Sequence, residues 1–387
     1  MKRMVYQLWI CFLKTLFYVF RIFSIDNNKV VLSSYGGKGF GDNSKYIALK
    51  LHEINPNAKL YWVVKNTSYE FPEWITKVKL NSIRFVYEMV TAKIWVDNSR
   101  KPLYIRKRNG QQYIQTWHGG IGLKRCEGDT VEPLPNEWIL TSKHDSEMID
   151  LMVSNSTFCT EMYKRAFWYK GEIMEVGSPR CDVLVNCSEE MKKHIRKELS
   201  IDLDTLIVLY APTFRSNDVV DAYDIDVEKV IQSYNKQTKK EVVFLLRFHP
   251  LTNPANYRIS FNKKVVDVTD YPDMYELMAV TDVLITDYSS TMMEFMFAKK
   301  EVQLYVKDYD EYSKERGCWF SLEDLPFTLS KTNEQLLYAI ENFDYEAYIS
   351  RINSFEKKVN LKEDGTASEK VANVINEIML NGEKKKK

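Results

Sequence analysis

The sequence predicts an α/β fold made of two Rossmann-like, doubly wound domains, preceded by an amphipathic membrane helix. Short apolar runs alternate with helical stretches along most of the chain. Several of these runs, such as Ile207–Ala211 and Val283–Thr286, are apolar without interruption, which is typical of parallel strands covered on both faces. A length of 387 residues suits about two domains.

Composition narrows the class of protein. Apolar residues make up 45% of the chain and charged residues 28%, as in an ordinary globular protein, so the bulk of the chain is not expected to be disordered or a coiled coil. The 54 Lys and Arg nearly balance the 53 Asp and Glu, so no nucleic-acid partner is expected.

Residues 1–25 form the predicted membrane helix. The longest uncharged run, Met4–Leu13, has ten residues, and a bilayer span needs about 20. The polar residues recur at steps of four, seven and seven, which puts them on one stripe of a helix: Arg3, Gln7, Lys14 and Arg21. This pattern predicts a helix lying in the membrane interface, with the cationic stripe toward anionic lipid. A helix buried against the domain and a true span are the alternatives. The lysines at 384–387 are either a solvated tail or a second, weak attachment to an anionic leaflet.

The two predicted domains are residues 26–186 and 187–387, with the boundary near Asn186–Glu190. The strand candidates of the first are Val30–Tyr35, Leu60–Val64, Ile94–Asp97, Tyr113–Thr116, Trp138–Thr141 and Ile173–Val176; those of the second are Ile207–Ala211, Val242–Phe248, Val265–Val268, Val283–Thr286 and Val302–Val306. The helix candidates are Ser44–Glu53, Asp145–Val153, Asp226–Gln237, Met274–Val280 and Thr291–Ala298. After Thr332 the chain reads as helical to about Leu380 and is expected to pack back across both domains.

Ligands of open α/β sheets bind beyond the carboxyl ends of the strands, so with two such sheets we expect the site in a cleft between them. The loop at 36–43 after the first strand is rich in glycine, but it matches neither familiar nucleotide-binding pattern. Its glycines would let the backbone approach a substrate, and Asp42 or Asn43 would cap the following helix.

A histidine follows another predicted strand of the first domain. His118 stands at a strand end, and Gly119 and Gly120 come directly after it, on a turn with open backbone. A lone histidine is commonly a satisfied structural residue. Its position here makes a functional role equally plausible.

Three strand ends of the second domain carry polar groups. Arg215 follows one strand and His249 follows the next. Ser289 and Ser290 lie between a third strand and the helical run at 291–298, where free backbone N–H groups favour an anion. Together these residues predict a diphosphate site. No Asp-x-Asp follows a strand, so neither a metal bridge nor any other cofactor is indicated.

The order and spacing of these motifs resemble the CDP-glycerol glycerophosphotransferase family, the teichoic-acid primases and polymerases of Gram-positive bacteria. The resemblance runs from about Val30 to Val374. It rests on WHG at 117–119 with Lys124 and Asp129 downstream, GSPRCD at 177–182, APTFR at 211–215, FHP at 248–250, ITDYSS at 285–290, the stretch with Tyr305, Asp308, Tyr312 and Arg316-Gly317, and DGTAS at 364–368.

The resemblance implies a GT-B fold, with an acceptor-side first domain and a CDP-polyol-binding second domain. It also implies a reaction in which an acceptor hydroxyl, on an undecaprenyl-diphosphate-linked saccharide, attacks the β-phosphorus of CDP-glycerol and CMP leaves. His118 would be the general base and His249 the catalytic contact to the donor diphosphate. The other implied donor contacts are Thr213, Arg215, Asp287, Ser289, Ser290, Glu294 and Arg316. The implied acceptor side holds Gly119, Gly120, Lys124, Asp42 and Asn43.

Departures from the family pattern leave alternatives open. Gly120–Lys124 replaces the usual Thr-Pro-Leu-Lys run, and Glu294 stands where the family has Asp. CDP-ribitol is therefore an alternative donor. A nucleotide-sugar glycosyltransferase of the same fold and a non-catalytic membrane-bound partner are the rival functions. The expected location is the cytoplasmic face of the cell membrane, with the protein attached peripherally.

Overall fold

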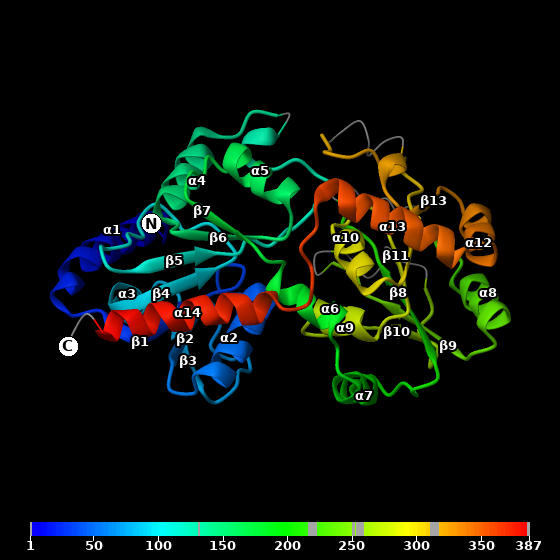
Figure 1. Cartoon of the computed structure of the whole chain (residues 1–387), viewed down its shortest axis with the longest axis horizontal. Helices are drawn as coiled ribbons and strands as arrows, with labels where there is room; N and C mark the ends of the chain where they lie inside the picture. Colours follow the sequence, from blue (N-terminus) through cyan, green and yellow to red (C-terminus); the bar gives the residue numbers. More distant parts are fainter. Residues whose placement is uncertain are drawn as a thin grey trace. The chain divides into compact units, whose positions relative to one another are not determined.

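The computed structural model describes residues 2–130, 132–215, 223–249, 252, 259–309 and 317–384. The chain forms two compact units, each built on one parallel sheet flanked by helices (Figure 1). The first unit contains Met1–Gly120, Cys126–Asp182 and Leu361–Lys387, and the second contains Ile121–Arg125 and Val183–Asn360. Two Rossmann-like α/β units are what the sequence predicted, and this part of the prediction is confirmed.

The sheet of the first unit has seven parallel strands in the order β3-β2-β1-β4-β5-β6-β7. The strands are β1 (Asp26–Leu32), β2 (Lys59–Val64), β3 (Ile75–Lys79), β4 (Ala92–Asp97), β5 (Gln112–Gln115), β6 (Leu151–Ser154) and β7 (Glu172–Glu175). The helices are α1 (Lys2–Val19), α2 (Asp42–Ile54), α3 (Ile83–Thr91), α4 (Asn136–Met148), α5 (Thr157–Ala166) and α14 (Ala367–Lys384), with short 3₁₀ turns at Phe20–Ile22, Glu127–Asp129 and Pro179–Cys181.

Helix α14 completes the core of this first unit, although it is the last element of the chain. Val371 and Ile375 join α2 and the central strands in one buried hydrophobic cluster, and α14 runs beside α2 in Figure 1. Asp182 fixes the start of α14, because its carboxylate accepts the backbone N–H of Ala367 at 3.0 Å and of Ser368 at 2.7 Å. Residues 361–387 of the predicted 187–387 domain therefore lie in the first unit, and the long segment of the second unit begins after Asp182.

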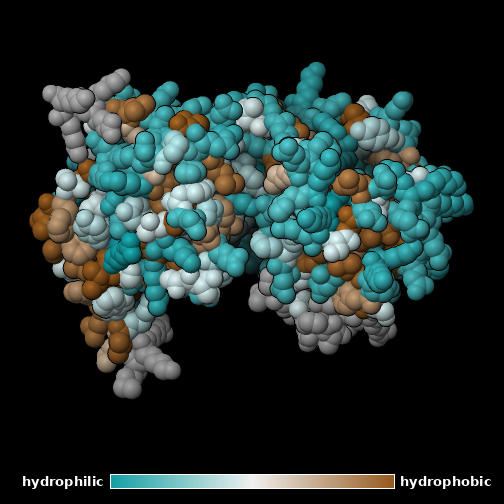
Figure 2. Space-filling model, turned by 90° about the horizontal axis from the view of Figure 1, so that it is seen from below, coloured by the Kyte–Doolittle hydropathy of each residue, from teal (hydrophilic) through white to brown (hydrophobic). Residues whose placement is uncertain are grey.

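Helix α1 packs on the first unit through one narrow face. Leu13 and Phe17, four residues apart, are fully buried, and the ring of Phe17 lies edge-on to Phe85 of α3. Ten large apolar side chains in this region stay exposed: Met4, Val5, Tyr6, Leu8, Trp9, Phe12, Tyr18, Val19, Ile22 and Phe23. They contribute to the hydrophobic surface at the left of Figure 2. By length and composition, Met4–Ile22 is the one candidate membrane span among the described residues, with 19 residues and a mean hydropathy of 1.3.

The second unit has six parallel strands in the order β10-β9-β8-β11-β12-β13. They are β8 (Leu206–Ala211), β9 (Val242–Leu246), β10 (Val265–Asp267), β11 (Val283–Thr286), β12 (Glu301–Tyr305) and β13 (Thr328–Ser330). The helices are α7 (Glu189–Glu198), α8 (Val227–Thr238), α9 (Met274–Val280), α10 (Thr291–Phe295), α12 (Asn333–Glu341) and α13 (Tyr345–Val359), with 3₁₀ turns at Met296–Ala298 and Leu322–Asp324; the short α6 (Asp182–Val185) joins the units.

Two local predictions are wrong. Trp138–Thr141 lies in α4 and not in a strand, and Trp138 and Leu140 are half or more exposed. A four-residue apolar run does not distinguish a strand from a piece of helix. The predicted helix Asp145–Val153 covers the end of α4 and most of β6.

Candidate active site

Both groups of predicted site residues lie where the strand order of a sheet reverses. In the first unit the order reverses between β1 and β4, and in the second between β8 and β11. Tyr35 and Asn98 follow β1 and β4, and His118 follows β5, the next strand. At such a point the loops after two neighbouring strands run to opposite faces of the sheet, so a crevice opens between them. Doubly wound sheets bind their ligands in this crevice.

Two aromatic rings and one hydrogen bond position the imidazole of His118. Its ring stacks on Trp117 with centroids 4.3 Å apart. The Tyr35 ring is tilted relative to the imidazole, and their centroids are 5.5 Å apart. Nδ1 lies 2.6 Å from the carbonyl oxygen of Asn98. A carbonyl oxygen only accepts hydrogen bonds, so Nδ1 carries the proton and Nε2 is left as the basic nitrogen.

Burial lowers the pKa of His118 below its ordinary value, and the positive charge of Arg180 acts in the same direction. The hydrogen bond to Asn98 and the charge of Asp42 oppose the shift without cancelling it. The imidazole is therefore neutral at neutral pH. A neutral imidazole with Nε2 unprotonated is the form that accepts a proton from a hydroxyl group.

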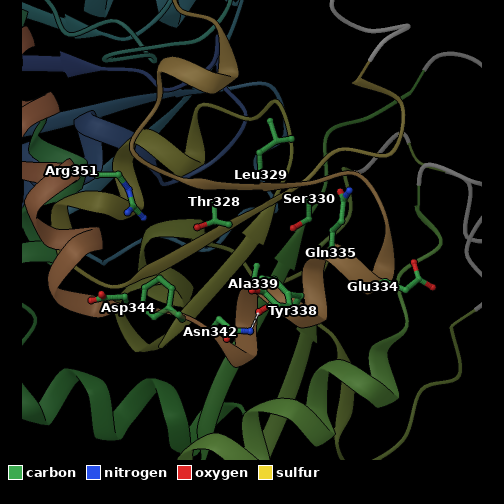
Figure 3. Close-up of a pocket in the computed structure, with 11 residues that line it drawn as sticks. Thr328, Leu329, Ser330, Glu334, Gln335, Tyr338, Ala339, Asn342, Asp344 and Arg351 are labelled. Carbon is green, nitrogen blue, oxygen red and sulfur yellow. Dashed lines mark hydrogen bonds between the residues drawn. The ribbon is translucent and has the colours of Figure 1, made fainter.

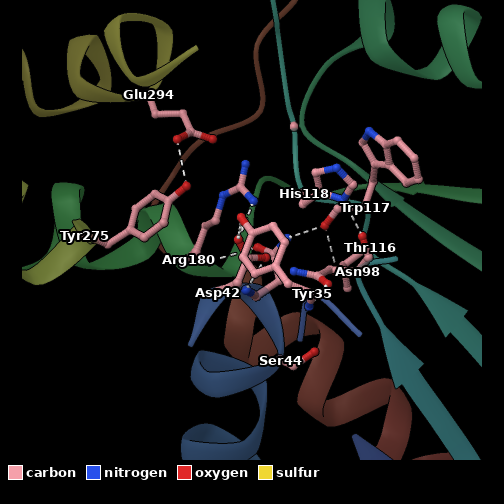
Figure 4. A network of polar contacts seen from close by, with 12 residues as sticks. Tyr35, Asp42, Ser44, Asn98, Thr116, Trp117, His118, Arg180, Tyr275 and Glu294 are labelled. Carbon is pink, nitrogen blue, oxygen red and sulfur yellow. Dashed lines mark hydrogen bonds and ion pairs between the residues drawn. The ribbon is translucent and has the colours of Figure 1, made fainter. Parts of the chain in front are cut away.

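A polar network holds the loop beside His118 (Figure 4). The carboxylate of Asp42 accepts hydrogen bonds from Arg180 and from the Tyr35 hydroxyl, both at 2.7 Å. The Asn43 side chain donates to the Trp117 carbonyl at 3.0 Å and accepts the Arg180 backbone N–H at 3.1 Å. Asp42 and Asn43, predicted on the acceptor side, thus fix the loops that carry Tyr35 and Trp117. Arg180 belongs to the GSPRCD motif at 177–182, and nothing in the sequence alone assigns it this role.

Three residues of this network have a left-handed backbone conformation. Tyr35, Asp42 and Trp117 adopt positive φ angles of 45°, 59° and 54°. Non-glycine residues in this region are uncommon, and such strain gathers at functional sites where the surrounding contacts enforce it. A Cβ at Gly120 would lie 2.4 Å from the Asn155 side-chain nitrogen, so a larger residue there would displace this buried amide.

The guanidinium of Arg100 packs against the Trp117 ring, a contact that was not predicted from the sequence. Its guanidinium carbon lies 5.2 Å from the Trp117 ring and 4.6 Å from that of Phe167. One guanidinium nitrogen donates to the buried Asp145 at 3.2 Å. No local sequence signal marks this contact, since Arg100 and Trp117 are brought together only by the pairing of β4 with β5.

The second group of residues surrounds a pocket of about 410 Å³ beyond β8, β9 and β11. It is lined by Lys124, Ala211, Pro212, Thr213, Phe214, Arg247, Phe248, His249, Met274, Ser289 and Thr291. Thr213, His249 and Ser289 are thus brought together as the sequence predicted. Lys124 was predicted as an acceptor-side residue, and the structure places it in the second unit, on this wall.

The described wall of this pocket holds three basic residues and no acidic one. The hydroxyl groups of Ser289 and Thr291 lie 2.8 Å apart at its edge. The predicted helix at 291–298 is only partly α-helical, since α10 ends at Phe295 and a 3₁₀ turn follows. The groups of this pocket that suit an anion are therefore its basic and hydroxyl side chains more than a helix dipole.

Arg215 and Asp287 lie in an ion-pair cluster and not among the residues that line the pocket. Arg215 donates to Asp287 at 2.7 Å and to Asp308 at 2.6 Å. Asp287 also accepts the Thr213 backbone N–H at 2.9 Å and the Thr213 hydroxyl. The pair thus holds Thr213 in place at the pocket wall.

The remaining predicted donor contacts are placed as follows. Ser290 precedes α10, and Glu294 is buried with one oxygen accepting the Tyr275 hydroxyl at 2.7 Å (Figure 4). Neither is among the described residues of the pocket wall. Arg316 lies outside the described residues. Among the residues that are described, no three His, Cys, Asp or Glu side chains group as metal ligands would.

A larger cavity of about 510 Å³ lies beside β13, α12 and the start of α13 (Figure 3). Its described lining includes Tyr338, Phe343 and Arg351 but none of the residues that the motifs single out. Size alone therefore does not locate the chemistry of this chain.

Comparison with known proteins identifies the family. The chain is 32% identical over 361 residues to a teichoic acid poly(glycerol phosphate) polymerase of Staphylococcus epidermidis, covering 89% of this chain and 50% of the polymerase. It is 30% identical over 370 residues to a teichoic acid glycerol-phosphate transferase of Staphylococcus aureus, covering 90% of this chain and 93% of the transferase. The chain thus spans about half the length of the first relative and nearly all of the second.

A solved structure of a variant of the wall teichoic acid polymerase TagF matches with a TM-score of 0.84 and 29% identity, over 98% of this chain and 97% of that one. The model of the CDP-Glycerol:Poly(glycerophosphate) glycerophosphotransferase family matches residues 15–377. The chain therefore belongs to the CDP-glycerol:poly(glycerophosphate) glycerophosphotransferase family, as its motifs predicted.

Proposed function

We propose that this protein transfers glycerol phosphate from CDP-glycerol to a membrane-lipid-linked saccharide and releases CMP, in the synthesis of teichoic acid or a related cell-surface glycopolymer. The observation that carries the proposal is the base-like state of His118, with Nδ1 fixed by the Asn98 carbonyl and Nε2 available. A second strand-end site, rich in basic and hydroxyl groups, accompanies it in the other unit.

The proposed reaction is a direct phosphoryl transfer. The acceptor hydroxyl oxygen attacks the β-phosphorus of CDP-glycerol, and the bond from that phosphorus to the bridging oxygen breaks. CMP leaves with the bridging oxygen, and the proton of the attacking hydroxyl passes to Nε2 of His118. Such transfers depend mainly on positioning and on stabilisation of phosphate charge. Because the pKa of His118 is lowered, the ring is neutral at neutral pH and can accept a proton.

The donor pocket supports a nucleoside diphosphate. In the described wall, Ser289 and Thr291 share one hydrogen bond, so one of their two hydroxyl protons is left to donate, and His249 adds a ring nitrogen. The Thr213 hydroxyl donates to Asp287. Phe214 packs beside His249 with ring centroids 5.5 Å apart and supplies an aromatic surface. Another solved TagF variant, 30% identical over 92% of this chain, was soaked with CDPG, which supports the same class of donor here.

The proposed acceptor is a saccharide on undecaprenyl diphosphate, whose lipid tail stays in the bilayer. The catalytic residues must therefore work at a membrane surface, and we propose the cytoplasmic face. The apolar side chains that α1 leaves exposed are suited to an interfacial contact, since Leu13 and Phe17 already attach the helix to the first unit. Cationic Lys14, also exposed, would favour anionic lipid.

The leaving nucleotide tests the proposed function. Purified protein is incubated with a lipid-linked saccharide and, in separate reactions, CDP-glycerol, CDP-ribitol or UDP-sugars, and the released nucleotide is identified by chromatography. CMP from CDP-glycerol is expected. Faster CMP release from CDP-ribitol would replace glycerol by ribitol in the proposed donor and leave the proposed type of reaction unchanged. Release of UDP from a UDP-sugar would mean glycosyl transfer, and release of CDP from a CDP-polyol would mean transfer of the polyol without its phosphate. No release from any donor would favour a non-catalytic role.

A further inference from the structure

The segment Ile121–Arg125 belongs to the second unit, although the chain on both sides of it belongs to the first. Backbone hydrogen bonds fix it there. Arg125 donates to the Gly317 carbonyl at 3.0 Å, and Trp319 donates to the Leu123 carbonyl at 2.9 Å. Lys124 pairs with Cys318 as a short antiparallel bridge between these two bonds. The segment is thus an additional strand-like piece of the second unit.

The residues just before this segment are held in the first unit. Gly120 lies so close to the buried Asn155 side chain that a Cβ would be 2.4 Å from its nitrogen, and the Gly119 carbonyl accepts a hydrogen bond from the Tyr163 hydroxyl at 3.2 Å. His118 directly precedes these glycines. One short stretch of chain therefore carries the candidate base at its start and a pocket-lining lysine at its end.

The chemistry of the pocket indicates what Lys124 meets there. The described wall has no carboxylate, and of its basic residues Arg247 already donates through one nitrogen to the carbonyls of Val268 and Tyr271, at 3.3 and 2.6 Å. Arg215, the arginine predicted for the phosphates, pairs with two carboxylates instead. Lys124 adds an ammonium group to a wall that also carries the hydroxyls of Ser289 and Thr291. Ammonium and hydroxyl groups without carboxylates favour a phosphate ligand.

We propose that Lys124 binds the diphosphate of the nucleotide donor. Through the short chain from His118 to Lys124, binding of the donor would then order the backbone at 117–120, here called the histidine loop. The proposal deepens the proposed function and rests on it for the identity of the nucleotide. It assigns Lys124 two effects: a direct one on donor affinity and an indirect one on His118. A lysine with only a structural role in the Cys318 bridge would show neither, because that bridge is made by the backbone.

Calorimetry tests the direct effect. The full chain carrying Lys124→Met, Lys124→Arg or the control Lys264→Met is titrated with CDP. Lys264 is an exposed lysine of the same unit, paired with Glu241 at 2.7 Å. A charge-assisted contact predicts an affinity about 10- to 100-fold weaker for Lys124→Met, a smaller loss for Lys124→Arg, and none for Lys264→Met. Unchanged CDP affinity in Lys124→Met would overturn the proposal.

A panel of UDP, ADP, GDP and inorganic pyrophosphate separates this inference from the proposed function. If the wild type prefers another nucleotide to CDP, the donor assignment fails, but the same Lys124-dependent loss is expected for that nucleotide. If the wild type binds neither a nucleoside diphosphate nor pyrophosphate, the Lys124 assignment itself is wrong.

Hydrogen exchange tests the indirect effect without using activity. The preferred diphosphate, at saturation in both proteins, is expected to slow amide exchange in the peptide covering 117–125 in the wild type and to slow it less in Lys124→Met. Equal slowing in the two proteins, or no slowing in the wild type, would contradict the coupling to the histidine loop.

Discussion

Nδ1 of His118 lies 2.6 Å from the carbonyl oxygen of Asn98, which follows β4 at the point of the first sheet where the strand order reverses between β1 and β4. The contact fixes the tautomer of the ring, because a carbonyl oxygen requires a protonated nitrogen. Trp117 and Tyr35 fix the orientation of the ring. The nitrogen that is left without a proton in the neutral ring is therefore Nε2.

Replacing His118 with Ala is expected to lower turnover about 10²- to 10⁴-fold, the usual contribution of a general base. Binding of CDP should be almost unchanged, because the pocket assigned to the donor is lined by residues of the second unit. Turnover is measured as CMP release and binding by calorimetry. A variant that loses both turnover and CDP binding would contradict the separation of roles.

The acid limb of kcat/KM is expected below pH 6.5, the ordinary pKa of histidine, because burial and Arg180 lower the pKa of His118. Since the neutral ring is the active form, activity is retained at neutral pH and is lost as the pH falls through the lowered pKa. His144→Gln is the control, since this histidine contacts Arg106 and the Ile105 carbonyl and takes no part in the network around His118. An acid limb above pH 6.5, or one that moves in the His144 variant, would exclude His118 as its source.

Arg215→Ala is expected to destabilise the second unit by about 3–5 kcal/mol, because it leaves two largely buried carboxylates without their cation. Denaturant unfolding measures the change, and Lys264→Met, which breaks an exposed pair, should cost less than about 1 kcal/mol. If Arg215→Ala is as stable as the wild type but no longer binds CDP, then Arg215 contacts the phosphates, as the sequence suggested.

Glu363 gives the first unit a pH-dependent stability. Burial raises the pKa of this carboxyl to about 8, although hydrogen bonds from Ser178 oppose the shift. The folded protein thus keeps a proton that the unfolded chain releases near 4.5, so this group's contribution to stability falls as pH rises from about 5 to 8 and is constant above that.

Glu363→Gln should remove that slope, and Glu377→Gln on the exposed side of α14 should not. The free energy of unfolding is measured at pH 5, 6.5 and 8. Parallel profiles for the wild type and Glu363→Gln would show that the carboxyl is ionised across this range.

The exposed face of α1 is expected to bind anionic vesicles. Leu8→Glu with Phe12→Glu should reduce sedimentation with the vesicles, since each buried side chain of this kind contributes roughly 1.5–3 kcal/mol. Leu13 and Phe17 are kept, so the helix stays attached to its unit. High salt should weaken wild-type binding only in part, because the apolar contact is not screened. Leu203→Glu, at an exposed leucine of the second unit, is the control, and equal sedimentation of all three proteins would move the membrane contact elsewhere.

The sequence predicted the strand-end positions of His118, Thr213, His249 and Ser289 because a strand, a turn and a helix each leave a local pattern. The weakly patterned strands were missed. β3 reads Ile-Thr-Lys-Val-Lys with two charged residues, and β13 has three residues.

What the sequence could not give depends on contacts between distant residues. Lys124 and Cys318 are 194 positions apart, and no local pattern shows that 121–125 joins the second unit. The same holds for Arg215, whose partner Asp308 lies 93 positions away. A motif gives the type of a residue and its place on a strand, while its partner is decided by the packing of the sheet.

The central claim is that a phosphoryl group is transferred and CMP leaves. It is tested most directly by measuring, in one reaction with CDP-glycerol and a lipid-linked saccharide, both the CMP released and the mass gained by the acceptor. The account predicts one CMP for each glycerol phosphate added, and almost none of either with His118→Ala. Release of CDP, or an acceptor that gains glycerol without its phosphate, would contradict it.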